Sequence, residues 1–229
     1  MTDDASAPVA TDPFPDDTLA AALARHSFAL PAEQSALLDR YCRALWEWNE
    51  KLNLTRHTTY EKFVGRDVVD SASLLPYVGE GDRVIDVGTG GGVPGIILKI
   101  LRPDIDITLT DSVAKKARAV DEIVKQIELK AKVFVGRAEE VLATRKVETL
   151  VVRAVAPLAK LVTWFAPHAA AFRRLLVIKG PSWVEERYEA RQKKLLQPWQ
   201  LRNVAEWPLP GTNNNSVLLE LVHRDSPKD

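Results

Sequence analysis

Residues 84–95 constrain the fold more than any other part of the chain. They read Val-Ile-Asp-Val-Gly-Thr-Gly-Gly-Gly-Val-Pro-Gly, an apolar run containing an acid that leads into a glycine-rich loop. Glycine lets backbone amides approach a ligand closely, and proline suits the first turn of a helix. A strand, a glycine loop and a helix in this order predict a nucleotide cofactor bound at the start of the helix.

Glycine spacing alone does not identify that cofactor. Gly90, Gly92 and Gly95 satisfy the G-x-G-x-x-G pattern of dinucleotide-binding proteins. Asp86 separates the alternatives, because it would stand beside the diphosphate of a nicotinamide dinucleotide, and burying those negative charges together is costly. S-adenosylmethionine instead carries a cationic amino group and a sulfonium. The sequence favours S-adenosylmethionine, with Asp86 and Gly90 as candidate contacts and a nicotinamide-dependent oxidoreductase as the second hypothesis.

From residue 83 onward, short β-rich runs alternate with helical segments, which indicates a mostly parallel sheet covered by helices on both faces. We expect a Rossmann-like α/β fold with about seven strands. The expected strands cover residues 83–87, 105–110, 132–135, 149–152, 175–178, 200–206 and 216–222. The expected helices cover residues 93–101, 113–127, 139–143, 158–172 and 182–196.

The chain before this sheet has helical patterning. After Pro31, apolar side chains recur at helical spacing from Leu37 to Leu52, and a second helical segment is expected at about 59–70. The first 16 residues are acidic, contain three prolines and hold few apolar side chains. We expect a flexible acidic tail at 1–16, a helical extension at 17–76 and a cofactor-binding domain at 77–229.

Composition excludes several classes of protein. In 229 residues, 31 Lys and Arg balance 31 Asp and Glu, and the apolar stretch at 161–172 is too short to cross a bilayer. Residues 1–18 lack the apolar core of a signal peptide, so a cytoplasmic protein without membrane attachment is expected. The single Cys42 and four scattered histidines predict no metal site.

Charge is unevenly distributed along the chain. Residues 160–202 hold nine bases and only three acids. Such a segment either binds a phosphate backbone or forms a solvated helix face. A non-catalytic RNA-binding module is therefore a third hypothesis.

Acids at the ends of the expected strands mark further cofactor contacts. Asp111 ends the second strand, where a carboxylate accepts hydrogen bonds from both ribose hydroxyls, although it could instead cap the following helix. After the third strand, the Ala138 amide and Glu139 are candidates for the adenine edge, although Glu139 could simply begin a helix.

The fourth strand ends at Arg153, where the methyl acceptor would enter. Enzymes that methylate exocyclic amines often have Asn-Pro-Pro or Asp-Pro-Pro here, and carbon methylation needs a thiolate, which Cys42 is badly placed to supply. Guanine N7 needs no general base, because its in-plane lone pair attacks directly. Arg153 would contact guanine O6 or a phosphate. Lys179 would contact acceptor phosphate, or act as a base for ribose methylation.

Several segments together resemble the bacterial 16S rRNA guanine-N7 methyltransferase G family, also called glucose-inhibited division protein B. The likeness spans about 37–180. It is carried by Trp-Asn-Glu-Lys-Leu-Asn-Leu-Thr at 48–55, Asp70-Ser71, Asp-Val-Gly-Thr-Gly-Gly-Gly-Val-Pro-Gly at 86–95, Leu-Thr-Asp-Ser at 109–112, Gly-Arg-Ala-Glu at 136–139, Arg-Ala-Val-Ala at 153–156 and Leu-Val-Ile-Lys-Gly at 176–180.

The resemblance implies a class I methyltransferase fold and methyl transfer from S-adenosylmethionine to guanine N7, leaving S-adenosylhomocysteine. The implied substrate is 16S rRNA or the small ribosomal subunit, and we expect a monomer. It implies cofactor contacts at Gly88, Val93, Asp111, Ala138, Glu139 and Arg153.

On that interpretation, four side chains of the helical extension are candidate RNA contacts. They are Trp46, Asn49, Asn53 and Arg56. Trp46 would stack on a base or serve in ordinary packing. The family often has Arg-His before its Asp-Ser, whereas here Arg66 is followed by Asp67, an acid where RNA would approach.

Overall fold

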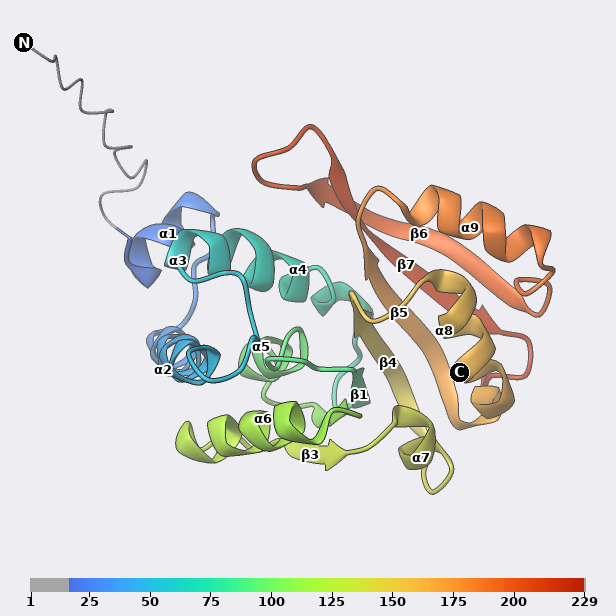
Figure 1. The fold of residues 1–229 in the computed structure, drawn as a ribbon, viewed down its shortest axis with the longest axis horizontal. Coiled ribbons are helices and arrows are strands. Elements are labelled where there is room, and N and C mark those ends of the chain that lie inside the picture. Colours follow the sequence, from blue (N-terminus) through green and yellow to red (C-terminus); the bar gives the residue numbers. More distant parts are fainter. Residues whose placement is uncertain (1–16, 229) are drawn as a thin grey trace, which may run out of the picture.

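A seven-stranded sheet forms the centre of the protein (Figure 1). The computed structural model describes residues 17–228, so the expected tail at 1–16 lies outside the described residues. In spatial order the strands run β3-β2-β1-β4-β5-β7-β6, and β7 pairs antiparallel with both of its neighbours while the others are parallel. The strands are β1 (Arg83–Val87), β2 (Asp106–Asp111), β3 (Lys132–Val135), β4 (Val147–Arg153), β5 (Phe172–Lys179), β6 (Trp199–Pro208) and β7 (Asn215–His223). The expected fold class is confirmed.

Helices cover both faces of the sheet. Figure 1 shows the extension at one side of the sheet and α8 and α9 at the other. The extension contains α1 (Leu19–Arg25), α2 (Ala32–Asn49), α3 (Tyr60–Lys62), the π-helix η1 (Phe63–Val68), α4 (Val69–Ala72) and the 3-10 turn η2 (Leu75–Tyr77). The remaining helices are α5 (Gly95–Leu101), α6 (Ala114–Gln126), α7 (Ala138–Leu142), α8 (Leu158–Phe165), the 3-10 helix η3 (Ala166–Ala171) and α9 (Trp183–Gln192).

Strand alternation divides the core into two layers. Val84 packs with α2, α5 and α6, whereas its neighbour Ile85 packs with α7 and α8 on the opposite face. Successive residues of a strand point to opposite faces of the sheet. Because helices bury both faces of this parallel sheet, both faces carry apolar side chains. The extension therefore shares one hydrophobic core with the cofactor-binding half, and the domain boundary at residue 76 stays a prediction.

Two expected helices differ from their predicted form. The segment expected as one helix at 59–70 is interrupted by the π-helix Phe63–Val68, a form common at functional sites. The helix expected to reach Phe172 ends at Phe165, because Pro167 has no N–H to donate and the chain continues as a 3-10 helix.

The topology places a ligand site at the junction of β1 and β4. The chain leaves β1 toward β2 on one side and later returns to β4 on the other, so the order of the strands reverses there. Ligands of open α/β sheets bind outside the carboxyl ends of the strands at such a point. Among the described residues, no helix has the length and apolar character needed to span a membrane.

Candidate active site

The glycine loop links β1 to α5 at that junction. Gly88 and Gly90 have φ values of +65° and +60°, which residues other than glycine rarely adopt. Thr89 N donates to Thr110 O at 2.8 Å and ties the loop to β2. A Cβ on Gly88 would lie 2.8 Å from Val155 Cγ2, so the loop also lies directly against the segment that follows β4.

Asp86 lies beneath the loop and is fully buried. Its Oδ2 accepts hydrogen bonds from Thr89 Oγ1 at 2.6 Å and from Gly95 N at 2.9 Å. Burial raises the pKa of Asp86 to about 6, and those two bonds act in the opposite direction. Asp86 thus holds the loop and the start of α5 from within the protein, and its contact with the cofactor stays a prediction.

Asp111 occupies the position expected of a ribose ligand. Its Oδ2 accepts from Gly90 N at 3.0 Å and its Oδ1 accepts from Val113 N at 2.8 Å. Because Val113 immediately precedes α6, Asp111 caps this helix. It also keeps the position expected for binding a ribose. Each carboxylate oxygen has two acceptor sites, so one remains on each oxygen for a ribose hydroxyl.

A cavity of about 350 Å³ opens above the glycine loop, and we call it the donor cavity. This volume lies within the range of small-molecule sites, about 300–1,000 Å³. A Cβ at Gly90 would meet only Gly88 O, at 3.9 Å, so the glycine leaves the loop open to a ligand. The lining comprises Leu45, Leu54, Thr55, Gly88, Thr89, Gly90, Gly91, Val93, Asp111, Ser112, Lys116, Arg153, Ala154 and Val155.

This lining suits S-adenosylmethionine, because it combines loop amides, a carboxylate placed for a ribose and apolar walls. Three of its residues come from the helical extension, which thus forms part of the site. Ala138 and Glu139 follow β3 at the same edge of the sheet but do not line the cavity. Ala138 is buried and Glu139 is half-buried. Their contact with adenine stays a prediction.

Arg153 sits at the carboxyl end of β4 in a network of buried charges. Its Nη2 donates to Asp67 Oδ1 at 2.6 Å and its Nη1 donates to Asp70 Oδ2 at 3.0 Å. Both carboxylates are almost completely buried. Burial alone would lower the pKa of Arg153, but the two carboxylates outweigh it and raise the pKa.

Other polar groups complete the same network. His57 Nδ1 lies 2.9 Å from Asp67 Oδ1, and Trp207 Nε1 donates to Asp70 Oδ1 at 3.0 Å. The expectation that Asp67 faces approaching RNA is wrong, because its side chain is ion-paired inside the protein. Sequence reasoning noted Asp67 and Asp70 but did not connect either with Arg153.

A second cavity, of about 530 Å³, meets the donor cavity at Arg153. We call it the acceptor cavity. The two share Arg153, Ala154 and Val155, and Ala154 has a φ of +55°, unusual for a residue with a side chain. The lining of the acceptor cavity comprises His57, Arg66, Asp70, Arg153, Ala154, Val155, Ala156, Pro157, Ile178, Lys179, Gly180, Ser182, Glu186 and Ser216.

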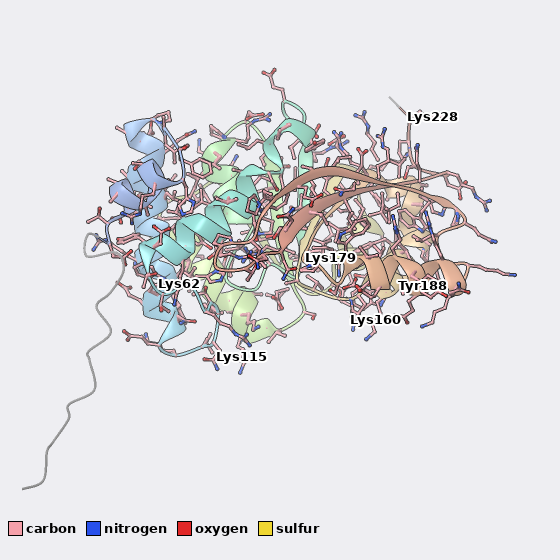
Figure 2. All side chains as sticks on the ribbon, turned by 90° about the horizontal axis from the view of Figure 1, so that it is seen from above. Lys62, Lys115, Lys160, Lys179, Tyr188 and Lys228 are labelled. Carbon is pink, nitrogen blue, oxygen red and sulfur yellow. The ribbon has the colours of Figure 1, made fainter. Side chains whose placement is uncertain are left out.

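Lys179 lines the acceptor cavity as expected from its place at the end of β5, but it is already paired. Its Nζ donates to Ala156 O at 2.7 Å and lies 2.7 Å from Glu186 Oε2. The side chain is only 9% exposed, and Figure 2 shows it within the middle of the molecule. The ammonium has three N–H donors, so one remains for a phosphate, whereas a role as base would require Lys179 to lose a proton and with it the ion pair to Glu186.

The four residues of the extension that were predicted to contact RNA have different surroundings in the structure. Trp46 serves in packing, since its Nε1 donates to His57 O at 2.8 Å and its ring lies edge-on to Tyr60. Asn49 Oδ1 accepts from Leu54 N and Thr55 N at 2.8 and 2.9 Å, so it shapes the wall of the donor cavity. The other two side chains, Asn53 and Arg56, are exposed, and their contact with RNA stays a prediction.

Comparison with known proteins decides the family. Residues 34–208 match the family model described as rRNA small subunit methyltransferase G. The chain belongs to this family. It is 45% identical over 191 residues to the ribosomal RNA small subunit methyltransferase G of Rhodopirellula baltica, covering 83% of this chain and 82% of the relative. The protein of that name in Symbiobacterium thermophilum is 37% identical, covering 80% of this chain and 79% of the relative.

Solved structures share the fold of this family member. TrmK of M. capricolum in complex with S-adenosyl-homocysteine superposes with a TM-score of 0.53 at 10% identity, over 69% of each chain. MtNAS in complex with MTA and tNA gives 0.53 at 15% identity, covering 88% of this chain and 81% of that one. At these identities the likeness concerns the fold. Within residues 17–228 no cluster of three or more His, Cys, Asp or Glu side chains is arranged to hold a metal ion.

Proposed function

We propose that this chain transfers the methyl group of S-adenosylmethionine to N7 of a guanine in 16S rRNA. The observation that carries the proposal is the meeting of the two cavities at Arg153, Ala154 and Val155. A methyl donor in one cavity and an acceptor in the other would be held next to each other at these three shared residues. Proximity of this kind supplies much of the rate in a direct transfer. The family and its named relatives favour a methyl donor over a nicotinamide dinucleotide.

The donor cavity supplies the groups that would hold the cofactor. Asp111 would accept hydrogen bonds from the ribose, and the backbone around Gly88, Gly90 and Val93 would line the amino-acid portion. Ala138 and Glu139 are proposed for the adenine. When bound, S-adenosylmethionine presents an electrophilic methyl group on sulfur, which the N7 lone pair takes directly, leaving S-adenosylhomocysteine and a cationic guanine.

The acceptor cavity is suited to an acceptor that loses no proton. Among the described residues in its lining, the carboxylates of Asp70 and Glu186 are ion-paired with Arg153 and Lys179, respectively. Either carboxylate would have to leave its ion pair before accepting a proton, and His57, whose Nδ1 lies 2.9 Å from Asp67 Oδ1, is another group in the lining able to act as a base. The pairing of both carboxylates is consistent with guanine N7, which loses no proton on methylation.

Arg153 is the proposed catalytic residue, because it lines both cavities. Its guanidinium is fixed by two carboxylates, which keeps it in one orientation without the cost of ordering it at each turnover. A fixed donor at this point would hydrogen-bond guanine O6, which lies beside N7 on the same edge of the base. Asp67 and Asp70 act through Arg153 as positioning residues.

The proposal can be tested by incubating the purified protein with 16S rRNA and labelled S-adenosylmethionine and then locating the label. The expected result is label in 7-methylguanine after digestion and mass spectrometry. Label confined to ribose or to an exocyclic amine would show that the acceptor has been misassigned. Calorimetry with S-adenosylmethionine and NADH should show binding of the first only. We further propose that the protein works as a monomer in the cytoplasm.

A further inference from the structure

A third cavity lies at the opposite end of the sheet from Arg153. It has a volume of about 660 Å³ and is bounded by the start of β5, the start of β6 and the end of β7. We call it the basic groove. Its lining comprises Arg173, Arg174, Gln197, Pro198, Trp199, Gln200, Arg202, Glu220, Val222, His223, Arg224, Ser226, Pro227 and Lys228.

Positive charge dominates this groove. Five bases and one acid line it, and the acid, Glu220, is already engaged by Arg202 at 2.5 Å. Two flanking acids, Asp82 and Asp225, lie 3.5 Å from Arg174 and 4.0 Å from Arg224. Among the described residues, the five bases outnumber these three acids. The Arg202 and Arg224 side chains are 58% and 76% exposed, so their guanidinium groups are accessible from solvent.

Two donors in the lining have no partner within the described structure. Trp199 Nε1 and Ser226 Oγ are buried without a hydrogen bond. Leaving such a group unsatisfied costs on the order of 1–3 kcal/mol, so these atoms are unusual in a native protein. Both are hydrogen-bond donors, as are the surrounding guanidinium groups, so the lining as a whole matches a ligand rich in acceptor oxygens.

The basic surface continues beyond the groove. A cavity of about 370 Å³ next to the start of β4 is lined by Arg145, Lys146 and His168, with no acid in its lining. The pairing of Val147 with Phe172 brings the starts of β4 and β5 together, so the two cavities are neighbours. Bases thus lie near the starts of β4, β5 and β6, while Glu148, also at the start of β4, is paired with Arg83.

We propose that the basic groove binds the phosphate backbone of the RNA substrate at a distance from the methylated base. This rests on the proposed function, which makes RNA the substrate. Arg173 lines the groove and Lys179 lines the acceptor cavity, six residues apart on β5, which corresponds to roughly 20 Å at 3.2–3.4 Å per residue. A polynucleotide reaches both sites, whereas a small anion would occupy one cavity and leave the other bases unused. Phosphate contacts of this kind position an RNA without reading its sequence.

Arg224→Glu combined with Lys228→Glu tests the groove, because both side chains are exposed and neither is in the catalytic machinery. Figure 2 shows Lys228 at the rim of the molecule, away from Lys179. The matched control is Lys125→Glu combined with Lys132→Glu, which makes the same charge change at side chains 62% and 59% exposed on α6 and β3. Each protein is assayed with 16S rRNA transcript and S-adenosylmethionine over a range of salt concentrations.

For the groove variant we expect a KM for RNA raised about tenfold, with kcat and the affinity for S-adenosylmethionine unchanged. The salt dependence of log K should also become shallower, by about 0.7–0.9 for each phosphate that the variant no longer neutralises. The control variant should keep the wild-type slope. Equal slopes for both variants, with the wild type active, would refute the groove while leaving the proposed function intact. An inactive wild type would instead refute the proposed function.

Cross-linking of the wild-type protein to 16S rRNA gives a second measurement that needs no variant. Ultraviolet irradiation followed by peptide mass spectrometry should identify cross-links within residues 197–202 and 222–228. Cross-links confined to the mouth of the acceptor cavity would overturn the proposal.

Discussion

Arg153 Nη2 lies 2.6 Å from Asp67 Oδ1, and this contact joins the end of β4 to the helical extension. The extension is therefore part of the active site. Leu45 and Thr55 also line the donor cavity, and Tyr41 Oη donates to Gly91 O in the glycine loop at 3.0 Å. The extension and the sheet form the site together.

Removing Asp67 should destabilise the protein strongly. Asp67→Ala leaves the largely buried Arg153 with one carboxylate instead of two, and breaking a buried pair from one side costs about 3–5 kcal/mol. Urea denaturation monitored by fluorescence would measure the change in the free energy of unfolding. The control is Glu189→Gln, which removes an exposed i,i+4 pair with Lys193 and should cost less than about 1 kcal/mol. Similar costs for both variants would contradict the role assigned to the buried pair.

Replacing Arg153 by lysine tests the geometry of the guanidinium separately from its charge. Arg153→Lys keeps a cation near Asp67 and Asp70, but one ammonium lacks the planar fork that reaches both carboxylates and a base. We expect kcat for methyl transfer to fall roughly 100-fold, which is typical for loss of one preorganised donor. Thermal unfolding should change much less than in Asp67→Ala. Retention of wild-type kcat would remove Arg153 from the catalytic role.

Much of the fold follows from local sequence patterns. Two of the seven strands, Arg83–Val87 and Lys132–Val135, have the predicted bounds, and the others differ at their ends because strands extend by pairing with neighbours that no local pattern reveals. Helix α1 was not predicted. It has only seven residues, although Thr18, whose Oγ1 accepts from Ala21 N, is a readable capping signal.

The site was harder to predict, because its contacts join distant parts of the chain. Asp111 could be placed from its position at the end of a strand. The partners of Arg153 lie 83 and 86 residues away, and Trp207 lies 137 residues from Asp70. The negative charge of Asp86 marked it as a candidate site residue in the sequence, but only the structure shows that its carboxylate is buried beneath the loop.

Asp111→Asn should weaken cofactor binding. The amide retains one acceptor oxygen, so the backbone N–H of Gly90 or Val113 loses its partner and the ribose loses a charged acceptor. A hydrogen bond to a charged group contributes about 1.5–3 kcal/mol, so calorimetry should show the Kd for S-adenosylmethionine raised about 10- to 100-fold. Asp106→Asn, at the exposed start of the same strand, is the control and should bind as the wild type does.

The buried carboxylate of Asp86 should make stability depend on pH. Its pKa is about 6 in the folded protein against an ordinary value of 3.8, so the folded state holds this proton more tightly than the unfolded state does. The contribution of Asp86 is therefore most favourable below about pH 4 and is lost as pH rises toward 6. The loss corresponds to about 3 kcal/mol.

Asp86→Asn isolates this effect from other titrating groups. The variant has no proton to lose, so the difference in unfolding free energy between variant and wild type should shift in favour of the variant as pH rises from 4 to 7. Urea denaturation at several pH values would measure it. A constant difference across this range would contradict the raised pKa.

Asn49→Ala should act on the donor cavity rather than on RNA. Asn49 Oδ1 accepts from the amides of Leu54 and Thr55, and both of these residues line the donor cavity. Losing the acceptor should cost about 1–3 kcal/mol of stability and raise the Kd for S-adenosylmethionine several-fold, because the wall it fixes becomes mobile. Asn49→Asp keeps an oxygen for both amides and should restore cofactor binding. If Asn49→Ala instead raised only the KM for RNA, the expectation of an RNA contact at this residue would be correct.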